Sequence, residues 1–287
     1  MRYYRRPGED GHRLVVADGD AVHDLTAVRP ELRGFGDLAR AAAVAGAGVD
    51  EVAARHLDAA PTLPDVPDDL ATPVVAGEVW AAGVTYEISE AAREEESGMP
   101  EIYLDVYDAE RPELFLKATP SRTVGPGEAV GVRADSSWDV PEPELGVVLY
   151  RGDVVGYTAG NDVSSRDIEG ANPLYLPQAK VYDRCCALGP AVASPETVGD
   201  PHDLEVSMTV RRDGDPIYEG ETSTGAMVRR CEDLVEWLTA HNDLPDLAVL
   251  LTGTSLVPPD EFTLTPGDRV RVAVESVGTL TNGVREV

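Results

Sequence analysis

The sequence predicts an α+β fold in which strands predominate. Turn dipeptides lie between β-rich apolar runs at three places, and two further apolar runs, residues 247–251 and 270–274, have the length of strands. The three turn dipeptides are Asp18-Gly19, Gly152-Asp153 and Asp213-Gly214. No Gly-x-Gly-x-x-Gly motif follows a strand pattern and no Gly-x-Ser-x-Gly motif is present, so a dinucleotide-binding fold and a serine-hydrolase elbow are both unsupported.

The beginning of the chain predicts a small separate domain. A hairpin pattern is followed by two helix patterns, at residues 12–27, 35–45 and 49–57. Residues 59–69 then contain three prolines and three acidic residues, a composition typical of a linker. We therefore expect a small N-terminal α+β domain over residues 1–70 and a larger domain over residues 71–287.

The larger domain is expected to be mostly β. Helix patterns lie at residues 88–97 and 230–241, and the proline-containing residues 169–178 are expected to form a loop. An apolar segment with a glycine break lies at residues 74–86. Strand patterns lie at residues 114–116, 142–149, 154–162, 208–212, 216–219, 247–251, 270–274 and 277–282.

The composition limits the partners of the protein. The 287 residues carry a formal net charge of −28, and the apolar fraction of 43% is that of a folded chain. An acidic field of this size repels nucleic acid and anionic lipid, so we expect neither as a partner. The acid is spread evenly, and 22 arginines stand beside two lysines, which resembles the proteins of salt-loving archaea. We therefore expect a halophilic protein, because salt screens the self-repulsion of the acids.

The same composition indicates a cytoplasmic protein. No apolar run of about 18 residues could span a membrane, and no apolar stretch follows the first residues as in a secretory signal. Cys185, Cys186 and Cys231 are an odd and sparse set, which favours a reducing compartment. The adjacent pair lacks metal-ligand spacing and is interpreted as packing.

Three carboxylates are expected to meet near the central hairpin. Glu142 and Glu144 are two residues apart, so both point to one face of a strand. Folding about the Gly152-Asp153 turn pairs residues whose numbers sum to roughly 305, which brings Asp162 back beside them. Such a trio needs a positive partner, and a hard divalent cation such as Mg²⁺ fits oxygen ligands. An edge hairpin with solvated acids is the alternative and stays open.

The chain contains very few lysines. Lys117 and Lys180 are the only two, and the chain uses arginine for every other fixed positive charge. A lysine provides a compact charge with a tunable pKa, which arginine does not. A functional role is therefore expected for both, with chance placement as the alternative.

Ordered motifs over residues 75–287 resemble the fumarylacetoacetate hydrolase family. They are Leu114-Phe115-Leu116-Lys117, Glu142-x-Glu144, Gly160-Asn161-Asp162-Val163-Ser164-Ser165-Arg166-Asp167, Lys180-Val181-Tyr182-Asp183, Leu188-Gly189-Pro190, Thr252-Gly253-Thr254 and Gly278-Thr279-Leu280-Thr281-Asn282. The resemblance implies the family's β-roll of mixed sheets with a small N-terminal domain, and a homodimer or homotetramer. It also implies that Glu142, Glu144 and Asp162 bind Mg²⁺ or Mn²⁺, that Lys180 is the family lysine and that Thr254 contacts the substrate.

Two segments resemble one branch of that family, which dehydrates 2-keto-3-deoxy sugar acids. These segments are residues 171–182 and residues 83–86 with the Ala-Arg-Glu-Glu-Glu-Ser run that follows. The implied reaction is that of a lyase, which converts a 2-keto-3-deoxy-pentonate from arabinose or xylose into 2,5-dioxopentanoate and water. The metal would act as a Lewis acid when the C3 proton leaves, and a general acid would help the C4 hydroxyl leave.

Further roles are left with alternatives. Glu113 is a candidate acid or base, and a solvated surface acid is equally open. Arg184 is a candidate for holding the substrate carboxylate, and a structural ion pair is equally open. Lys117 is a candidate substrate-binding residue. Lys180 either balances the charge of the chelated anion or, if its pKa is lowered, moves a proton.

The chain departs from members of the family that cleave carbon–carbon bonds. Those members carry a His-Glu dyad on a short lid helix, and here Ser89 and Ala92 fall at the two positions. Glu87 or Glu90 could substitute only with a different helical phase. Dehydration is therefore expected, and hydrolysis or decarboxylation of acylpyruvate-type 2-keto acids is the alternative. A Schiff base on Lys180 and a non-catalytic sugar-acid binding protein are two further alternatives.

Overall fold

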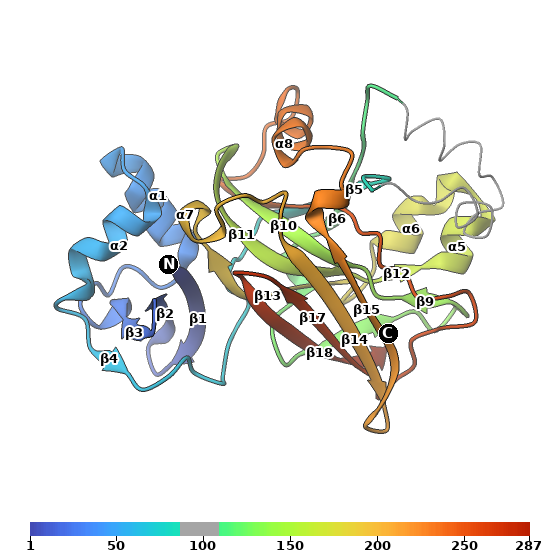
Figure 1. Cartoon of the computed structure of the whole chain (residues 1–287), viewed down its shortest axis with the longest axis horizontal. Coiled ribbons are helices and arrows are strands. Elements are labelled where there is room, and N and C mark those ends of the chain that lie inside the picture. The colour runs from blue at the N-terminus through green and yellow to red at the C-terminus, as the bar shows by residue number, and fades with distance from the viewer. Residues whose placement is uncertain (87–108) are drawn as a thin grey trace.

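One large sheet organises the protein (Figure 1). The computed structural model describes residues 1–86 and 109–287. The eleven strands of the large sheet are, in order across it, β4 (Thr62–Leu63), β3 (Ala21–Asp24), β2 (Gly11–Asp18), β1 (Arg2–Gly8), β13 (Cys186–Ala193), β11 (Asp153–Asp162), β10 (Pro143–Tyr150), β16 (Leu247–Leu251), β5 (Glu78–Gly83) and β6 (Glu113–Ala118), with β7 (Thr123–Val124) paired to β13.

A second sheet packs against the middle of the first. Its five strands are β15 (Asp215–Ser223), β14 (Glu205–Arg212), β17 (Arg269–Val274), β18 (Gly278–Glu286) and β8 (Ala129–Val132). A two-stranded ribbon is formed by β9 (Asp139–Val140) and β12 (Ser164–Ser165). Parallel and antiparallel pairs occur in both large sheets, and the expected mostly-β, mixed-sheet architecture is confirmed.

Helices cover the ends of the large sheet. Those of the described residues are α1 (Phe35–Ala45), α2 (Val49–Leu57), α5 (Arg166–Ala171), α6 (Leu176–Lys180), α7 (Pro195–Val198) and α8 (Cys231–Thr239), with short 3₁₀ turns η1 (Leu25–Ala27), η2 (Pro120–Arg122), η3 (Pro173–Tyr175) and η4 (Thr224–Ala226). In Figure 1, α1 and α2 lie at one end of the molecule, and α5 and α6 lie at the other. None of the helices within residues 1–86 and 109–287 is long and apolar enough to cross a membrane.

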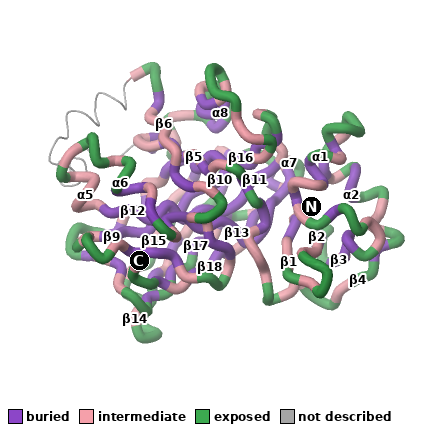
Figure 2. Tube along the Cα trace, turned by 180° about the vertical axis from the view of Figure 1, so that it is seen from behind, coloured by how far each residue is buried: buried purple, intermediate pink, exposed green. Residues whose placement is uncertain are grey.

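Successive side chains of β10 point to opposite faces of the large sheet, so this strand borders two hydrophobic cores. Leu145, Val147 and Leu149 belong to the apolar cluster shared with the five-stranded sheet. Val148 and Tyr150 point to the opposite face and pack in a cluster that includes residues of β1 and α1. Figure 2 shows the buried residues concentrated along these central strands. Glu144 lies on the same face of β10 as Val148 and Tyr150, because it is an even number of residues from both.

Local sequence signals account for most of these elements. The helices expected at residues 35–45 and 49–57 are α1 and α2, and α1 ends at Gly46, whose φ of 60° suits glycine. The helix expected at residues 230–241 is α8, and the hairpin expected around Asp213-Gly214 is the β14–β15 pair. The apolar segment at residues 74–86 contains β5. The helix expected at residues 88–97, with Glu87, Ser89, Glu90 and Ala92, lies outside the described residues.

The expected loop at residues 169–178 is wrong, because this segment is largely helical. It contains the end of α5, the η3 turn and the start of α6. Asn172 caps η3 by accepting from Leu174 N, and Pro173 and Pro177 occupy the first turns of η3 and α6. Proline is tolerated at the first position of a helical turn because its missing N–H would have no partner there.

The large sheet continues through the proposed domain boundary. Strand β1 pairs with β13 through Arg2–Ala193 and Tyr3–Val192, and this pairing joins the first four strands to the rest of the sheet. A domain boundary after residue 70 stays a prediction.

Candidate active site

The expected trio of carboxylates converges at one end of the central hairpin. Strands β10 and β11 pair antiparallel through Pro143–Asn161 and Glu144–Gly160, and Asp162 N donates to Glu142 O at 2.9 Å. Asp162 therefore lies opposite Glu142, one residue from the expected register. Oxygen atoms of Glu142, Glu144 and Asp162 lie within 4.8 Å of one another. All three side chains are buried, and both strands are central in the sheet, so the solvated edge hairpin is excluded.

The cluster has the character of a site for a hard divalent cation. Its donors are all carboxylate oxygens, which Mg²⁺ and Mn²⁺ prefer. Asp162 Oδ2 is buried and accepts no hydrogen bond from the described residues. Burial, followed by the charges of Asp162 and Glu142, raises the pKa of Glu144 well above its ordinary value. A bound cation would relieve this repulsion, so the residues fit a metal ion.

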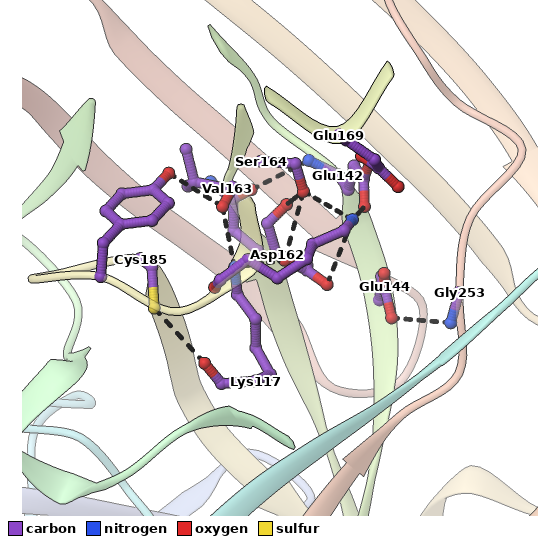
Figure 3. Close-up of polar contacts among 12 residues, drawn as sticks. Lys117, Glu142, Glu144, Asp162, Val163, Ser164, Glu169, Cys185 and Gly253 are labelled. Carbon is purple, nitrogen blue, oxygen red and sulfur yellow. Dashed lines mark hydrogen bonds and ion pairs between the residues drawn. The ribbon is translucent and has the colours of Figure 1, made fainter. Parts of the chain in front are cut away.

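Lys117 lies beneath Asp162 and holds it in place. Its Nζ contacts Asp162 Oδ1 at 2.5 Å and donates to Val163 O at 2.8 Å and to Lys180 O at 2.6 Å, as Figure 3 shows in part. An ammonium group has three protons, so these partners use all of them. Burial acts to lower the pKa of Lys117, but the charges of Asp162 and Cys185 and the hydrogen bond to Asp162 together outweigh burial and raise the pKa. Lys117 is fully buried and orients a carboxylate rather than facing a substrate.

Lys180 ends α6 and reaches the same carboxylates from above. Its Nζ donates to Glu142 Oε2 at 2.8 Å and to Ser164 Oγ at 2.6 Å, and lies 3.7 Å from Asp162 Oδ2. Burial acts to lower the pKa of Lys180, but Asp162 and Glu142 outweigh it and raise the pKa above its ordinary value. The residue is therefore an ammonium in this arrangement, which favours the charge-balancing alternative over proton transfer by Lys180.

Arg166 and Glu169, both on α5, are site residues without an assigned role in the sequence analysis. Arg166 lies 3.0 Å from Glu142 Oε1 and 3.8 Å from Glu169 Oε2, so it links α5 to the carboxylate cluster. With Lys180, it holds the pKa of Glu142 below its ordinary value against the opposing effect of burial. Arg166 stood within a recognised motif, so its position was visible. Glu169 was missed because its segment was expected to be a loop.

Glu113 begins β6 and faces this cluster. Burial raises the pKa of Glu113 to about 7, with further contributions from Glu169, Glu142 and Asp162. It pairs with Gly83 across β5 and β6, and a side-chain carbon at Gly83 would meet the carboxylate at 2.0 Å. Gly83 therefore makes room for Glu113. A carboxyl group that titrates near neutrality suits proton transfer better than a solvated acid does.

Thr254 and Arg184 have different positions relative to the cluster. Gly253 N donates to Glu144 Oε2 at 2.6 Å, which places the neighbouring Thr254 at the edge of the site. Gly253 has a φ of 83°, and any side chain there would collide with Thr85, so glycine is required for this approach. Arg184 is directed elsewhere: its Nε donates to Ala129 O at 2.6 Å and its Nη2 lies 3.8 Å from Glu128. The structure does not bring Arg184 to the cluster.

The formal charges of the site favour one divalent cation. Five carboxylates, those of Glu113, Glu142, Glu144, Asp162 and Glu169, face the three cationic side chains of Lys117, Lys180 and Arg166. With all five carboxylates ionised, the state that a bound cation favours at Glu113 and Glu144, the formal excess is two negative charges, which one Mg²⁺ balances. A 2-keto acid would then add its own carboxylate at a site that is no longer repulsive.

These features define a metal-dependent enzyme of mixed-sheet fold, and sequence comparison identifies its family. Residues 78–285 match the family model described as "Fumarylacetoacetate (FAA) hydrolase C-terminal". The chain belongs to the fumarylacetoacetate hydrolase family, as the resemblance of its motifs implied.

Two curated relatives and one solved structure are similar over most of the chain. The chain is 58% identical over 289 residues, 100% of both chains, to a "Probable 2-keto-3-deoxyxylonate dehydratase" of Haloferax volcanii. It is 42% identical over 219 residues, 75% of this chain and 74% of the relative, to a "2-dehydro-3-deoxy-D-arabinonate dehydratase" of Saccharolobus solfataricus. A structure of "2-keto-3-deoxy-D-arabinonate dehydratase complexed with magnesium and 2,5-dioxopentanoate" superposes with a TM-score of 0.83 at 31% identity, covering 100% of this chain and 99% of that chain.

Proposed function

We propose that this protein is a Mg²⁺-dependent lyase that dehydrates a 2-keto-3-deoxy-pentonate to 2,5-dioxopentanoate, the semialdehyde of 2-oxoglutarate. The observation that carries the proposal is the buried Glu142, Glu144 and Asp162 cluster beside Glu113 and Lys180. It is found in a chain that aligns along its full length with a dehydratase of this substrate class. The close relatives support this hydro-lyase function for the chain.

The carboxylate trio would hold Mg²⁺ through one oxygen from each residue. When bound, the ion supplies a Lewis acid that favours loss of a proton beside the keto group of a chelated 2-keto acid. Lys117 keeps Asp162 aimed at this position, and Gly253 does the same for Glu144. The site is thus preorganised by groups that do not touch the substrate.

Glu113 is our candidate for moving protons between C3 and the C4 hydroxyl. Its pKa of about 7 allows it to accept the C3 proton and to return a proton to the departing hydroxyl, which leaves as water. The C3–C4 double bond that results becomes the aldehyde when a proton is lost from C5 and one is gained at C3, followed by tautomerisation of the enol. Lys180 remains protonated and balances the negative charge that develops on the substrate. Glu169, close enough to raise the pKa of Glu113, would favour protonation of that carboxyl. Thr254 is proposed to contact the substrate from the strand end beside Glu144.

The charge of Lys180 and the residues around the carboxylate cluster disfavour the alternative reactions. A Schiff base needs a neutral amine, and Lys180 is held as an ammonium by Glu142 and Asp162. Hydrolysis of an acylpyruvate needs an activated water, and the described part of the site brings no histidine to the carboxylates. We therefore disfavour hydrolase or decarboxylase activity on acylpyruvate-type acids.

The proposal extends to salt adaptation, cellular location, oligomeric state and domain organisation. We propose a halophilic protein because of the charge of −28, and a cytoplasmic one because of the cysteine pattern. We propose a homodimer or homotetramer because the resemblance to the family implies one. Nucleic acid and membrane are not expected as partners for the same electrostatic reason. Residues 1–70 are proposed as an accessory unit attached to the catalytic residues 71–287.

The decisive experiment compares two substrate types on one preparation. Purified protein in molar KCl with Mg²⁺ is incubated with 2-keto-3-deoxy-arabinonate, with 2-keto-3-deoxy-xylonate and with an acylpyruvate. We expect 2,5-dioxopentanoate from at least one pentonate and no cleavage of the acylpyruvate. Cleavage of the acylpyruvate without dehydration of either pentonate would show that the proposed function is wrong, and ligand-induced stabilisation without any product would indicate a binding protein.

A further inference from the structure

A hollow lies away from the carboxylate cluster, where β1, β2 and the start of α1 meet the ends of β10 and β16. It is a cleft of about 470 Å³. Its walls come from β1, β2, the start of α1, the segment before β5, and the adjoining ends of β10 and β16. Tyr150 and Leu247, which line it, stand at the ends of β10 and β16 that are far from Glu144 and Gly253. Tyr150 lies six positions along β10 from Glu144, a distance of about 20 Å.

The cleft is basic in a strongly acidic protein. Arg5, Arg33 and Arg40 line it, together with His12. Its two acidic residues already have partners: Asp37 accepts from Arg33 N and lies 4.0 Å from Arg40, and Asp246 pairs with Arg151 at 2.9 Å. The guanidinium groups of Arg5 and Arg33 form no ion pair with any carboxylate among residues 1–86 and 109–287.

Arg5 is the most constrained of these cations. It is half-buried, and its Nη1 makes one long hydrogen bond, 3.4 Å, to Thr72 O. Burial lowers the pKa of Arg5, and the charge of Asp37 offsets only part of that effect, because the two side chains form no ion pair. Its side chain lies against Gly34, where an added Cβ would stand 3.4 Å from Arg5 Cδ. The absence of a side chain at Gly34 therefore leaves the cleft open beside the guanidinium.

The start of α1 adds to the positive field. The helix has 11 residues and begins after Gly34, which has no side chain to cap its first N–H groups. A helix N-terminus carries a partial positive charge, which adds to the two guanidinium groups. This charge is a supplement, because the two arginines without a carboxylate partner and the volume define the site.

The remaining walls set the size and nature of an occupant. Phe35, Val75, Tyr150 and Leu247 provide apolar surface, and Val75 is 52% exposed. A cleft of this volume exceeds what an inorganic anion fills, since one water occupies about 30 Å³ of liquid. The occupant therefore needs an anionic group for the arginines and a short carbon body for the apolar wall.

We propose that this cleft binds a small organic oxyanion, a carboxylate or a phosphate ester, through the guanidinium groups of Arg5 and Arg33. Nε and Nη2 of Arg5 make no hydrogen bond to the described residues and form a planar fork that can donate two parallel hydrogen bonds to either anion. Arg33 adds its charge and its Nη2, because its Nε and Nη1 already donate to Pro30 O and Asp10 O. The site is separate from the carboxylate cluster, and its occupation requires neither metal nor turnover. The proposal therefore stands or falls independently of the dehydratase function.

The test is calorimetric titration of the full, metal-free chain with two probes. Glutarate represents the carboxylates and glycerol 3-phosphate the phosphate esters, each added at constant ionic strength in the KCl concentration that keeps the chain folded. Metal-free buffers keep the probes from binding through an ion at Glu142, Glu144 and Asp162. We expect saturable binding of at least one probe at one site per chain, and the probe that binds distinguishes the two sources.

Substitutions place the binding in the cleft. Arg5→Gln and Arg33→Gln should each weaken binding about tenfold or more, because each removes charge-assisted hydrogen bonds. Arg6→Gln is the matched control, since Arg6 is next to Arg5 on β1 but does not line the cleft, and its affinity should be unchanged. Arg33 is exposed, so its replacement keeps the test valid even if Arg5→Gln impairs folding. Absence of saturable binding by both probes, or binding that survives Arg33→Gln undiminished, would overturn the proposal.

Discussion

Lys117 Nζ lies 2.5 Å from Asp162 Oδ1, and both side chains are fully buried. A charge pair of this kind is expensive to break, because removal of one partner leaves the other charge without compensation. One of the two lysines in the chain therefore holds Asp162, a candidate metal ligand, in position. The relationship couples the stability of the fold to the geometry of the site.

The first prediction concerns this pair. Lys117→Met should lower the free energy of unfolding by about 3–5 kcal/mol and weaken Mg²⁺ binding, because Asp162 loses its 2.5 Å ion pair with Lys117. Unfolding by urea in constant KCl, with and without Mg²⁺, measures both effects. The double variant Lys117→Met with Asp162→Asn should recover much of the stability but not the affinity for Mg²⁺. Equal stability of the single variant and the unmodified protein would contradict the structural role of Lys117.

The second prediction separates metal binding from folding. Glutamine resembles the neutral form of Glu144, whose pKa is raised by burial and by Asp162 and Glu142. Glu144→Gln should therefore match or exceed the metal-free stability of the unmodified protein at pH 8. Activity should fall by more than about 1,000-fold, because the loss of a metal ligand removes several kcal/mol of transition-state stabilisation.

Thermal unfolding with added Mg²⁺ is the measurement that checks this contrast. The unmodified protein should gain about 2.7 kcal/mol of stability at an ion concentration 100 times the dissociation constant, and the variant should gain nothing at that concentration. Full turnover after exhaustive treatment with EDTA would instead show that the reaction needs no metal.

The third prediction is a pH dependence set by Glu113. A base acts in its ionised form, so kcat/KM should rise as the pH passes the pKa of Glu113, which is about 7 before a cation binds. The positive field of bound Mg²⁺ favours ionisation, so the rise should lie at or below that value. Glu113→Gln should remove this limb and slow the reaction about 100-fold or more. Glu110→Gln, an exposed acid nearby, is the control and should keep the profile.

The sequence revealed the parts of this site that local patterns encode. The turn after Tyr150 and the alternation of Glu142 and Glu144 are local, so the hairpin and its carboxylates were predicted within one residue of register. The contact between Lys117 and Asp162 joins residues 45 positions apart, and only the pairing of β5 with β16 and β6 makes it possible. Motif position alone could not show that Lys117 faces inward.

Two misplacements have specific physical causes. Residues 169–178 contain two prolines, which resembled a loop, yet both prolines occupy first turns where a missing N–H costs nothing. Arg184 lies four residues after Lys180, but its backbone has a φ of 58° and its side chain turns toward Ala129. A left-handed backbone conformation at a residue other than glycine cannot be predicted from the sequence pattern.

The fourth prediction uses a second buried acid. Asp139 is 3% exposed, and burial raises its pKa to about 6 despite hydrogen bonds that lower it. A carboxyl with a raised folded-state pKa contributes stability at low pH, and that contribution is lost as the pH rises through about 6. Asp139→Asn should therefore stabilise the protein by about 1–2 kcal/mol at pH 8, after allowance for solvent screening, and by almost nothing at pH 4.

Chemical unfolding of both forms across pH 4–8 tests this sign. Asp135→Asn is a control of opposite direction, because Arg133 lowers the pKa of the exposed Asp135 through a hydrogen bond. That variant should lose a little stability near neutral pH and approach the unmodified protein at low pH. A variant at Asp139 that is less stable at pH 8 would mean that its ionised form is satisfied by partners.

The last prediction concerns salt. The 52 acidic side chains outnumber the 24 arginines and lysines, so at low ionic strength the folded chain repels itself. Raising KCl from 0.2 to 2 M shortens the screening length to about 3 Å or less, and the melting temperature should rise by about 5–10 °C. Sucrose at equal osmolality is the control, because it strengthens burial without screening charge and should produce a smaller rise. Both titrations need constant Mg²⁺, since K⁺ could otherwise compete at the carboxylate cluster and be mistaken for screening. A melting temperature that is flat across the KCl series would show that the acidic surface is compensated by local pairs, and the halophilic interpretation of the composition would then be wrong.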